Sequence, residues 1–191
     1  MTLLLVRHGR TAANASGLLL GRADPPLDPV GQRQAEAVAA TLVRPARVVS
    51  SPLQRCRETA ACFGVPVDVD ERWIELDYGE WDQQPLADLP TDVWVRWRSD
   101  LDLRPPGGET LRELGMRVRA ACDALLDEAR DTDVVVVTHV SPLKAALAWS
   151  LDVGDELAWR LHVTPASISR VTIRPQGPVL LSFNETAHLP D

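Results

Sequence analysis

The sequence predicts an α/β protein, a three-layer α/β/α sandwich around a mostly parallel sheet with an antiparallel edge strand. Two observations lead to this prediction. Short runs rich in Val and Leu alternate with longer segments in which apolar residues recur every three or four positions, which is typical of βαβ units. The last two apolar runs are separated only by residues 174–178 (RPQGP), a turn sequence that predicts an antiparallel hairpin.

Five segments are predicted to be strands, because each is a short run dominated by β-branched and other apolar residues. In chain order they are Leu3 to Arg7, Arg47 to Ser50, Val134 to Thr138, Ser167 to Ile173 and Val179 to Phe183.

Five further segments are predicted to be helices: Pro29 to Leu42, Pro52 to Phe63, about Asp92 to Trp97, Leu111 to Ala129, and Pro142 to Ser150. The fourth has the strongest support, because its apolar residues keep helical spacing and Thr110 with Glu113 forms a capping box before it. We expect Ser51 to cap the second helix, with Pro52 at the first helical position and Gln54 completing the box.

Residues 1–191 are expected to form one domain, since the chain has the length of a single domain and no repeat or linker divides it. Residues 73–109 are irregular and rich in Trp, Pro, Asp and Gly. We expect them to form a lid-like insertion over one end of the sheet, where substrate contacts usually vary. The closing hairpin leaves two alternatives open, a free sheet edge or the seam of a homodimer.

The charge balance excludes some classes of partner. The chain has 20 Lys and Arg against 27 Asp and Glu, a net charge of −7, so we expect it to bind neither nucleic acid nor a membrane surface. Lys144 is the only lysine. Every other fixed positive charge is arginine, whose planar guanidinium binds phosphate through two hydrogen bonds.

The cysteines and the apolar runs indicate a cytoplasmic protein. Cys56, Cys62 and Cys122 form no CxxC pair, which fits a reducing compartment. The apolar start is too short for a signal-peptide core, and no later stretch reaches the ~20 apolar residues of a membrane span.

Three places share one pattern: a buried strand ends, polar or cationic residues follow, and a helix begins. In chain order, the first of these places contains Arg7 and His8, the second contains Arg55, and the third contains His139. Ligands of open α/β sheets bind beyond the carboxyl ends of the strands, where helix N-termini offer free N–H groups to an anion. Each residue alone is more simply explained as a solvated arginine or a hydrogen-bonded histidine, but their joint placement predicts a phosphate site. No metal-ligand spacing and no G-x-S-x-G motif appear, so we expect neither metal nor cofactor.

Spaced motifs then resemble those of a known family. Residues 7–11 (RHGRT) with Asn14 resemble the R-H-G-x-T-x-x-N motif of the histidine phosphatase superfamily, which also holds the cofactor-dependent phosphoglycerate mutases. Further segments match in the family's order: 27–35 (LDPVGQRQA), 50–60 (SSPLQRCRETA), 74–81 (IELDYGEW), 105–110 (PPGGET) and the strand that precedes His139. The resemblance covers nearly the whole chain.

One segment departs from the family's common pattern. His139 is followed by Val140-Ser141 where many members have Gly-Gly, and valine lacks the conformational freedom of glycine. Residues 136–162 look most like α-ribazole phosphatase-like and actinobacterial acid phosphatase domains.

The resemblance implies a metal-independent phosphomonoester hydrolase that acts on a small phosphorylated metabolite. His8 would attack the phosphorus atom and form a phosphohistidine, and Glu75 would protonate the leaving group. His139 would help to stabilise the negative charge on the phosphoryl group during its transfer. Asp77 and Glu80 remain alternatives to Glu75. The phosphoryl group would be bound by the residues that match the motifs: Arg7, Thr11, Asn14, Arg55 and the backbone N–H of Val140.

Two other functions are weighed against hydrolysis. A phosphoglycerate mutase shares the phosphohistidine, but the family's mutases are longer, so we place it second. A phosphate-binding scaffold without activity is less favoured, because both histidines, both arginines and Glu75 are present.

Overall fold

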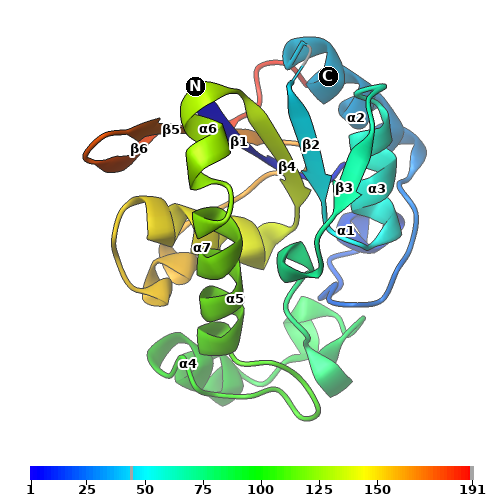
Figure 1. Cartoon of the computed structure of the whole chain (residues 1–191). Helices are drawn as coiled ribbons and strands as arrows, with labels where there is room; N and C mark the ends of the chain where they lie inside the picture. The colour runs from blue at the N-terminus through cyan, green and yellow to red at the C-terminus, as the bar shows by residue number, and fades with distance from the viewer. Residues whose placement is uncertain (44, 190–191) are drawn as a thin grey trace.

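The computed structural model describes residues 1–43 and 45–189, with a six-stranded sheet at its centre (Figure 1). The strands are β1 (Thr2–Arg7), β2 (Arg47–Ser50), β3 (Val67–Val69), β4 (Val134–Thr138), β5 (Ile168–Arg174) and β6 (Gly177–Glu185), in the spatial order β3-β2-β4-β1-β5-β6. The ladders β3–β2, β2–β4 and β4–β1 are parallel, whereas β5 is antiparallel to β1 and to β6. The predicted fold class is confirmed, and the β5–β6 hairpin closes one edge.

Helices cover both faces of this sheet. Leu3 and Leu5 of β1 pack against α5 (Leu111–Asp123) and α7 (Val140–Ser150), whereas Leu4 and Val6 pack against α2 (Pro29–Thr41) and α3 (Gln54–Ala61). This alternation follows from the two-residue period of a strand. Figure 1 shows α5 and α7 on one side of the sheet and α2 and α3 on the other.

Two helix starts show how local sequence sets the element boundaries. Asp28 caps α2 by accepting hydrogen bonds from the N–H groups of Val30 and Gly31, with Pro29 at the first helical position. The predicted capping box of Thr110 and Glu113 is present at the start of α5.

Some predicted boundaries are wrong. The helix predicted over residues 111–129 is two helices, α5 and α6 (Leu126–Asp131), because apolar spacing continues across the break at Leu125 and hides it. Two short elements, β3 and α1 (Ala12–Ala15), were not predicted, since three or four residues carry no periodic signal. Helix α7 begins at Val140, two residues before the predicted start.

The predicted cap of the second helix is also wrong. Helix α3 begins at Gln54, and its N-cap residue Leu53 makes no side-chain cap bond. The hydroxyl of Ser51 lies instead beside a histidine of the site described below.

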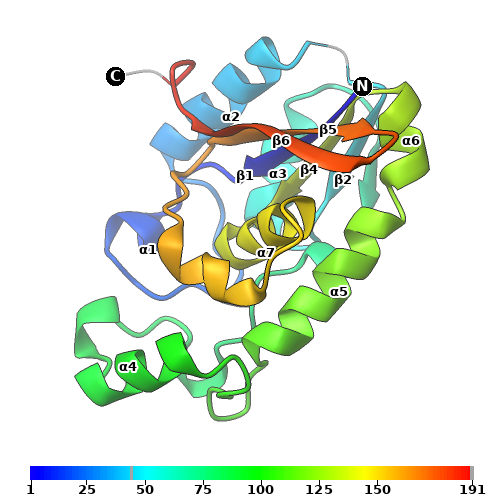
Figure 2. The same ribbon diagram turned by 90° about the vertical axis from the view of Figure 1, so that its left-hand side faces the viewer.

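The irregular segment over residues 73–109 packs through aromatic rings. It runs from the end of η1 (Glu71–Trp73) through η2 (Gly79–Trp81), η3 (Leu86–Asp88) and α4 (Thr91–Ser99). The ring of Trp97 contacts those of Tyr78, Trp81 and Trp94 at centroid distances of 5.4–5.7 Å, and that of Trp159 in η4 (Asp155–Arg160) at 5.4 Å. Figures 1 and 2 show α4 at the end of the molecule that lies beyond the carboxyl ends of β2 and β4.

In the part of the chain that the structure describes, every helix is too short or too polar to cross a bilayer.

Candidate active site

His8 follows β1 directly and is held in one orientation. Its backbone N–H donates to the carbonyl of Thr138 at the end of β4 (2.9 Å), and its ring Nδ1 lies 2.7 Å from the carbonyl oxygen of Gly9. Because a carbonyl only accepts hydrogen bonds, Nδ1 carries the proton and Nε2 keeps a free lone pair. The arrangement leaves the Nε2 atom of His8 unprotonated.

The loop after His8 is fixed by close backbone packing. The N–H of Gly9 donates to the hydroxyl of Thr59 in α3 at 3.1 Å. A Cβ at Gly9 would overlap the carbonyl of Gly31 in α2, and a Cβ at Gly31 would overlap the carbonyl of Arg10. Two glycines therefore allow α2 to lie directly against the loop that carries the histidine.

His139 lies at the end of β4 as the N-cap residue of α7, and its ring meets that of His8 edge to face at a centroid distance of 5.1 Å. Arg55 Nε donates to His139 Nδ1 (3.2 Å), so the proton of His139 sits on Nε2, 2.7 Å from the hydroxyl oxygen of Ser51. The sulfur of Cys56 is 3.3 Å from the same Nε2. The two histidines thus carry their protons on different ring nitrogens.

Arg7 and Arg55 bring buried positive charge to the two histidines. Arg55 is fully buried and donates to the carbonyls of Gly21 and Ala23, both at 2.7 Å. Arg7 donates from Nη1 to the carbonyl of Val163 (2.6 Å), and its buried Nε has no partner among residues 1–43 and 45–189.

Neither guanidinium forms an ion pair with a carboxylate of the described residues, whereas Arg10, for example, pairs with Asp28 at 2.7 Å. A buried cation without a counter-ion is costly, so these two arginines favour binding of an anion between them.

The surroundings keep both histidines neutral. Burial, together with the charges of Arg55 and Arg7, holds the pKa of His8 well below its usual range. Burial and the charge of Arg55 act on the pKa of His139 in the same direction. Burial lowers the pKa of Arg7 to about 10, which still leaves it charged at neutral pH. Two neutral imidazole rings therefore lie among fixed positive charges.

Glu75 is buried beside the start of α7. Its Oε1 accepts from the backbone N–H groups of Leu76 (2.7 Å) and Ser141 (3.2 Å), so the carboxyl group lies next to the chain that follows His139. The two alternative acids are placed differently: Asp77 pairs with Arg22 at 3.3 Å, and Glu80 is exposed. Of the three candidates, Glu75 alone is buried and in contact with the start of α7.

Thr11 and Asn14 lie in the loop after His8, and their polar groups bond mainly to each other. Thr11 caps α1, with distances of 3.0–3.2 Å between its hydroxyl and backbone N–H and the side chain and N–H of Asn14. No hydrogen bond within the described part of the chain joins either residue to His8, Arg55 or His139. The observed geometry gives both residues a capping role.

Val140 fits its position without glycine's freedom. It is the first residue of α7 and takes a helical backbone that any L-residue adopts, with no positive φ. Its backbone N–H belongs to the helix N-terminus, where N–H groups have no intrahelical partner.

Sequence reasoning missed the supporting roles of Ser51, Thr59 and Arg117. Arg117 of α5 donates to the carbonyls of Arg72 and Ile74 (2.7 Å each) and of Glu75 (3.2 Å) and so holds the segment that carries Glu75. Thr59 stands in the matched 50–60 segment, which is the one sequence feature that points to it. Arg117 is 42 residues from Glu75, and no local pattern links the two.

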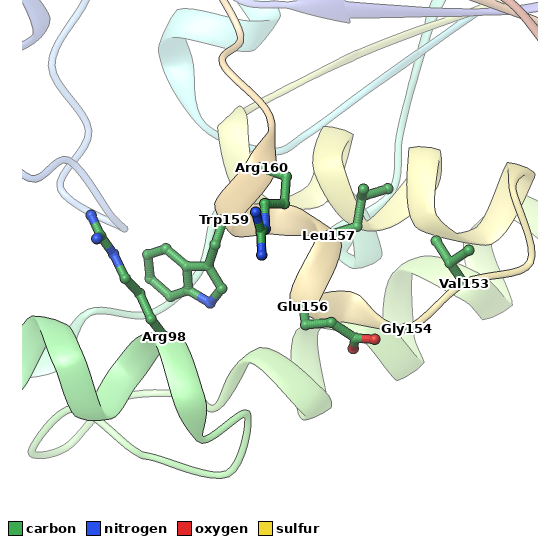
Figure 3. Close-up of a pocket in the computed structure, with 7 residues that line it drawn as sticks. All are labelled: Arg98, Val153, Gly154, Glu156, Leu157, Trp159 and Arg160. Carbon is green, nitrogen blue, oxygen red and sulfur yellow. The ribbon is translucent and has the colours of Figure 1, made fainter.

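A groove of about 590 Å³ lies between α4 and η4 (Figure 3). In this view Arg98 of α4 and Arg160 of η4 lie on either side of the Trp159 ring. None of the predicted site residues lines it.

Curated relatives of the chain include one longer protein and one of similar length. A bifunctional protein of Mycobacterium tuberculosis is 36% identical over 198 residues, which cover 98% of this chain and 54% of that protein. The chain thus spans about half the length of this relative. A probable phosphoglycerate mutase of Yersinia enterocolitica is 34% identical over 206 residues, covering 99% of this chain and 95% of that protein.

Solved structures with the same fold include two phosphatases. A phosphoserine phosphatase mutant from Entamoeba histolytica, in complex with phosphoserine, has a TM-score of 0.90 at 25% identity and covers 99% of both chains. The α-ribazole phosphatase from Shigella flexneri has a TM-score of 0.84 at 28% identity and covers 97% of this chain and 96% of that one.

The family match agrees with these relatives and with the motifs at both histidines. Residues 3–186 match the histidine phosphatase superfamily (branch 1), which is nearly the whole chain. The chain therefore belongs to the histidine phosphatase superfamily.

Proposed function

We propose that this protein hydrolyses a small phosphomonoester through a phosphohistidine on His8. One observation carries the proposal: Nδ1 of His8 is bound to the Gly9 carbonyl, so Nε2 is free to attack, beside buried arginines that no carboxylate of the described residues neutralises. Imidazole nitrogen is a competent nucleophile when its other nitrogen is held in this way.

In the first step, His8 Nε2 forms a bond to phosphorus and the bond from phosphorus to the ester oxygen breaks. Glu75 gives its proton to the departing alkoxide. Arg7 and Arg55 stabilise the negative charge spread over the phosphoryl oxygens, with the backbone N–H of Val140 as a further donor, while Thr11 and Asn14 fix the loop that carries His8.

In the second step, water attacks the phosphorus of phosphohistidine and the P–N bond breaks. The Glu75 carboxylate takes a proton from the water, inorganic phosphate leaves, and His8 is restored. No metal or cofactor enters either step, because the arginines supply the positive charge that Mg²⁺ supplies in kinases.

A mutase is the second candidate. A relative named as a probable phosphoglycerate mutase is matched over 95% of its own length, so chain length does not separate the two functions as expected from the sequence. Transfer of ³²P from a labelled bisphosphate to a monophosphate would favour the mutase, whereas release of labelled inorganic phosphate would favour the hydrolase.

The test is a steady-state assay of phosphate release in excess EDTA, with an alkyl phosphate and p-nitrophenyl phosphate as substrates. We expect the wild-type rate to persist in EDTA and His8→Ala to lose at least ~10³-fold in kcat, as removal of a nucleophile does. Glu75→Gln should lose more activity on the alkyl ester than on the nitrophenyl ester, because nitrophenolate leaves without a proton.

Glu80→Gln is the matched control, because Glu80 is an exposed glutamate on the same segment. Its rates should equal those of the wild type on both substrates. Activity retained by His8→Ala, or abolished by EDTA, would refute the proposed reaction.

We also place the protein in the cytoplasm. Its three cysteines, Cys56, Cys62 and Cys122, are all free thiols, which supports a reducing compartment.

A further inference from the structure

The loop of residues 21–23 binds a guanidinium through its carbonyls and a carboxylate through its N–H groups. The two terminal nitrogens of Arg55 donate to the carbonyls of Gly21 and Ala23, both at 2.7 Å. The backbone N–H groups of the same two residues donate to the two side-chain oxygens of Asp82, both at 2.8 Å. Asp82 therefore fixes the two peptide units to which Arg55 is bound.

Arg55 keeps two N–H groups for a phosphoryl group. Its Nε–H donates to Nδ1 of His139 at 3.2 Å, so together with the two carbonyl bonds three N–H groups are bound within the described part of the chain. A guanidinium has five N–H groups in one plane. The loop carbonyls thus set the direction of the remaining two, and a shift of the loop would turn them away from the phosphoryl oxygens.

Gly21 brings the loop against the segment that carries Glu75. A Cβ at Gly21 would lie 2.8 Å from the ring of Tyr78 and 3.0 Å from the carbonyl oxygen of Leu76. Leu76 directly follows Glu75 in the chain. The loop that orients the guanidinium and the segment of the proposed acid are therefore in direct contact, which only a residue without a side chain allows.

Asp82 stands in the irregular segment of residues 73–109, and backbone pairing holds it beside the loop. The N–H of Gln83 donates to the carbonyl of Leu19 at 2.7 Å, and the N–H of Leu19 donates to the carbonyl of Gln84 at 2.8 Å. Gln83 has a φ of 64°, in the left-handed region that a glutamine rarely adopts. The pairing maintains this turn directly after Asp82.

Another contact of the loop is exposed and contributes less to its position. Arg22 pairs with Asp77 at 3.3 Å and with Glu109 at 3.5 Å, but its side chain is 42% exposed. Exposed ion pairs stabilise a structure only slightly. Of the described residues, Asp82 alone accepts hydrogen bonds from backbone N–H groups of residues 21–23.

We propose that Asp82 is a positioning residue of the phosphoryl site and orients Arg55 through the backbone of residues 21–23. The inference rests on the proposed function, which places the phosphoryl group at Arg55. It adds a residue that affects binding of the phosphoryl group without touching it.

The first experiment measures binding of orthovanadate, an analogue of the phosphoryl group in transfer, by isothermal titration calorimetry. Asp82→Asn keeps the size of the side chain, but its NH₂ group does not accept a hydrogen bond, so one of the two loop bonds is lost. We expect its Kd to rise about tenfold, because misplacement of a binding group costs at least this much. Asp82→Glu keeps both acceptor oxygens on a longer side chain, and its Kd should lie between those of the wild type and Asp82→Asn.

Asp88→Asn is the matched control, because Asp88 is an exposed aspartate of the same segment whose carboxylate makes no hydrogen bond with any described residue. It removes the same charge and should leave Kd unchanged. Circular dichroism identifies the variants that are folded, and only these are titrated. A loss of stability alone does not change the affinity of folded protein for vanadate.

The second experiment tests whether Asp82 acts through Arg55. Asp82→Asn should lower kcat/KM for p-nitrophenyl phosphate about tenfold in the wild-type background and less than about twofold in Arg55→Lys, because lysine lacks the planar group that the loop orients. An equal loss in both backgrounds overturns the proposed route through Arg55.

The binding experiment also separates this inference from the proposed function. If no ester is hydrolysed while Asp82→Asn weakens vanadate binding and Asp88→Asn does not, the hydrolase fails and the positioning role stands. If esters are hydrolysed and the folded Asp82 variants bind vanadate as the wild type does, the positioning role is wrong and the hydrolase stands. A wild type that binds no vanadate overturns the positioning role as well.

Discussion

Ser51 shows how one hydroxyl can fix the protonation of a histidine. Its oxygen lies 2.7 Å from Nε2 of His139, while Arg55 Nε donates to Nδ1 on the other side of the ring. Together they hold His139 neutral, with a defined tautomer, 5.1 Å from the ring of His8. We regard Ser51 as a positioning residue, because it acts on the phosphoryl site through His139.

Ser51→Ala should lower kcat about tenfold, which corresponds to ~1.4 kcal/mol of transition-state stabilisation. Loss of the hydroxyl leaves Nε2–H of His139 buried with only the sulfur of Cys56, a weak acceptor, within reach, so the free energy of unfolding should also fall by about 1–3 kcal/mol. Steady-state kinetics and urea denaturation measure the two effects. Ser51→Thr keeps the hydroxyl and should recover part of kcat, which a purely structural role would not require.

Ser99→Ala is the control for this substitution, because Ser99 is an exposed serine at the end of α4 whose hydroxyl bonds only to its own helix. It should leave kcat unchanged. Wild-type kcat in Ser51→Ala would show that His139 needs no hydroxyl at Nε2.

At the scale of elements, α2 packs closely against the loop that carries His8. Gly31 lies in the first turn of α2, and Arg10 lies two residues after His8. The N–H of Gly31 binds the cap residue Asp28, and the Arg10 side chain binds the same carboxylate at 2.7 Å. The start of α2 and the loop that follows His8 therefore share one set of contacts.

Gly31→Ala tests this contact, because the contact should reverse the sign of the change in unfolding free energy that the substitution ordinarily causes. Replacement of glycine by alanine in a helix ordinarily stabilises by about 1 kcal/mol. Here the new Cβ would overlap the Arg10 carbonyl, so we expect the variant to lose about 1–3 kcal/mol of unfolding free energy and about tenfold in kcat/KM. Urea denaturation and steady-state kinetics measure both.

Ala40→Gly, at an exposed position near the other end of α2, is the matched control. It should cost no more than about 1 kcal/mol of unfolding free energy and leave kcat/KM unchanged. A Gly31→Ala protein more stable than the wild type would show that the loop after His8 moves away from the new Cβ without loss of unfolding free energy.

At the scale of the whole molecule, charge is arranged differently outside and inside. The net charge is −7, and many arginines on the outside pair with carboxylates, as Arg72 does with Asp70 at 2.6 Å. Arg7 and Arg55 pair only with carbonyls and a neutral histidine. The two arginines that lie beside the histidines are thus distinguished from those on the outside by their lack of a carboxylate partner among the described residues.

The buried histidines predict a pH dependence of stability. Because the pKa values of His8 and His139 are well below 6.5 in the folded protein, the unfolded chain binds more protons as pH falls below 6.5. Stability should therefore be highest above this pH and fall by about 1.4 kcal/mol for each histidine between pH 7.5 and pH 5.5.

Urea denaturation at several pH values measures this loss. His8→Gln removes one of the two groups and should halve the dependence. A stability that stays constant from pH 7.5 to pH 5.5 would contradict neutral buried histidines.

The sequence predicted the fold class and the strands that precede His8, Arg55 and His139 in the chain, because strand ends and motif spacing are local properties. It could not predict which partner the Ser51 hydroxyl takes, since a cap and a histidine 88 residues away compete for it. The contact between Arg117 and the Glu75 segment could not be predicted either, because packing between distant segments creates it.

Detection of the phosphoenzyme tests the central claim most directly. The wild-type protein is mixed with a ³²P-labelled phosphomonoester in EDTA, quenched in base within milliseconds, digested and analysed by mass spectrometry. We expect an acid-labile, base-stable phosphoryl group on the peptide that contains His8, and none in His8→Ala. Label on another residue, or turnover of the ester with no labelled protein at any time, would contradict the account.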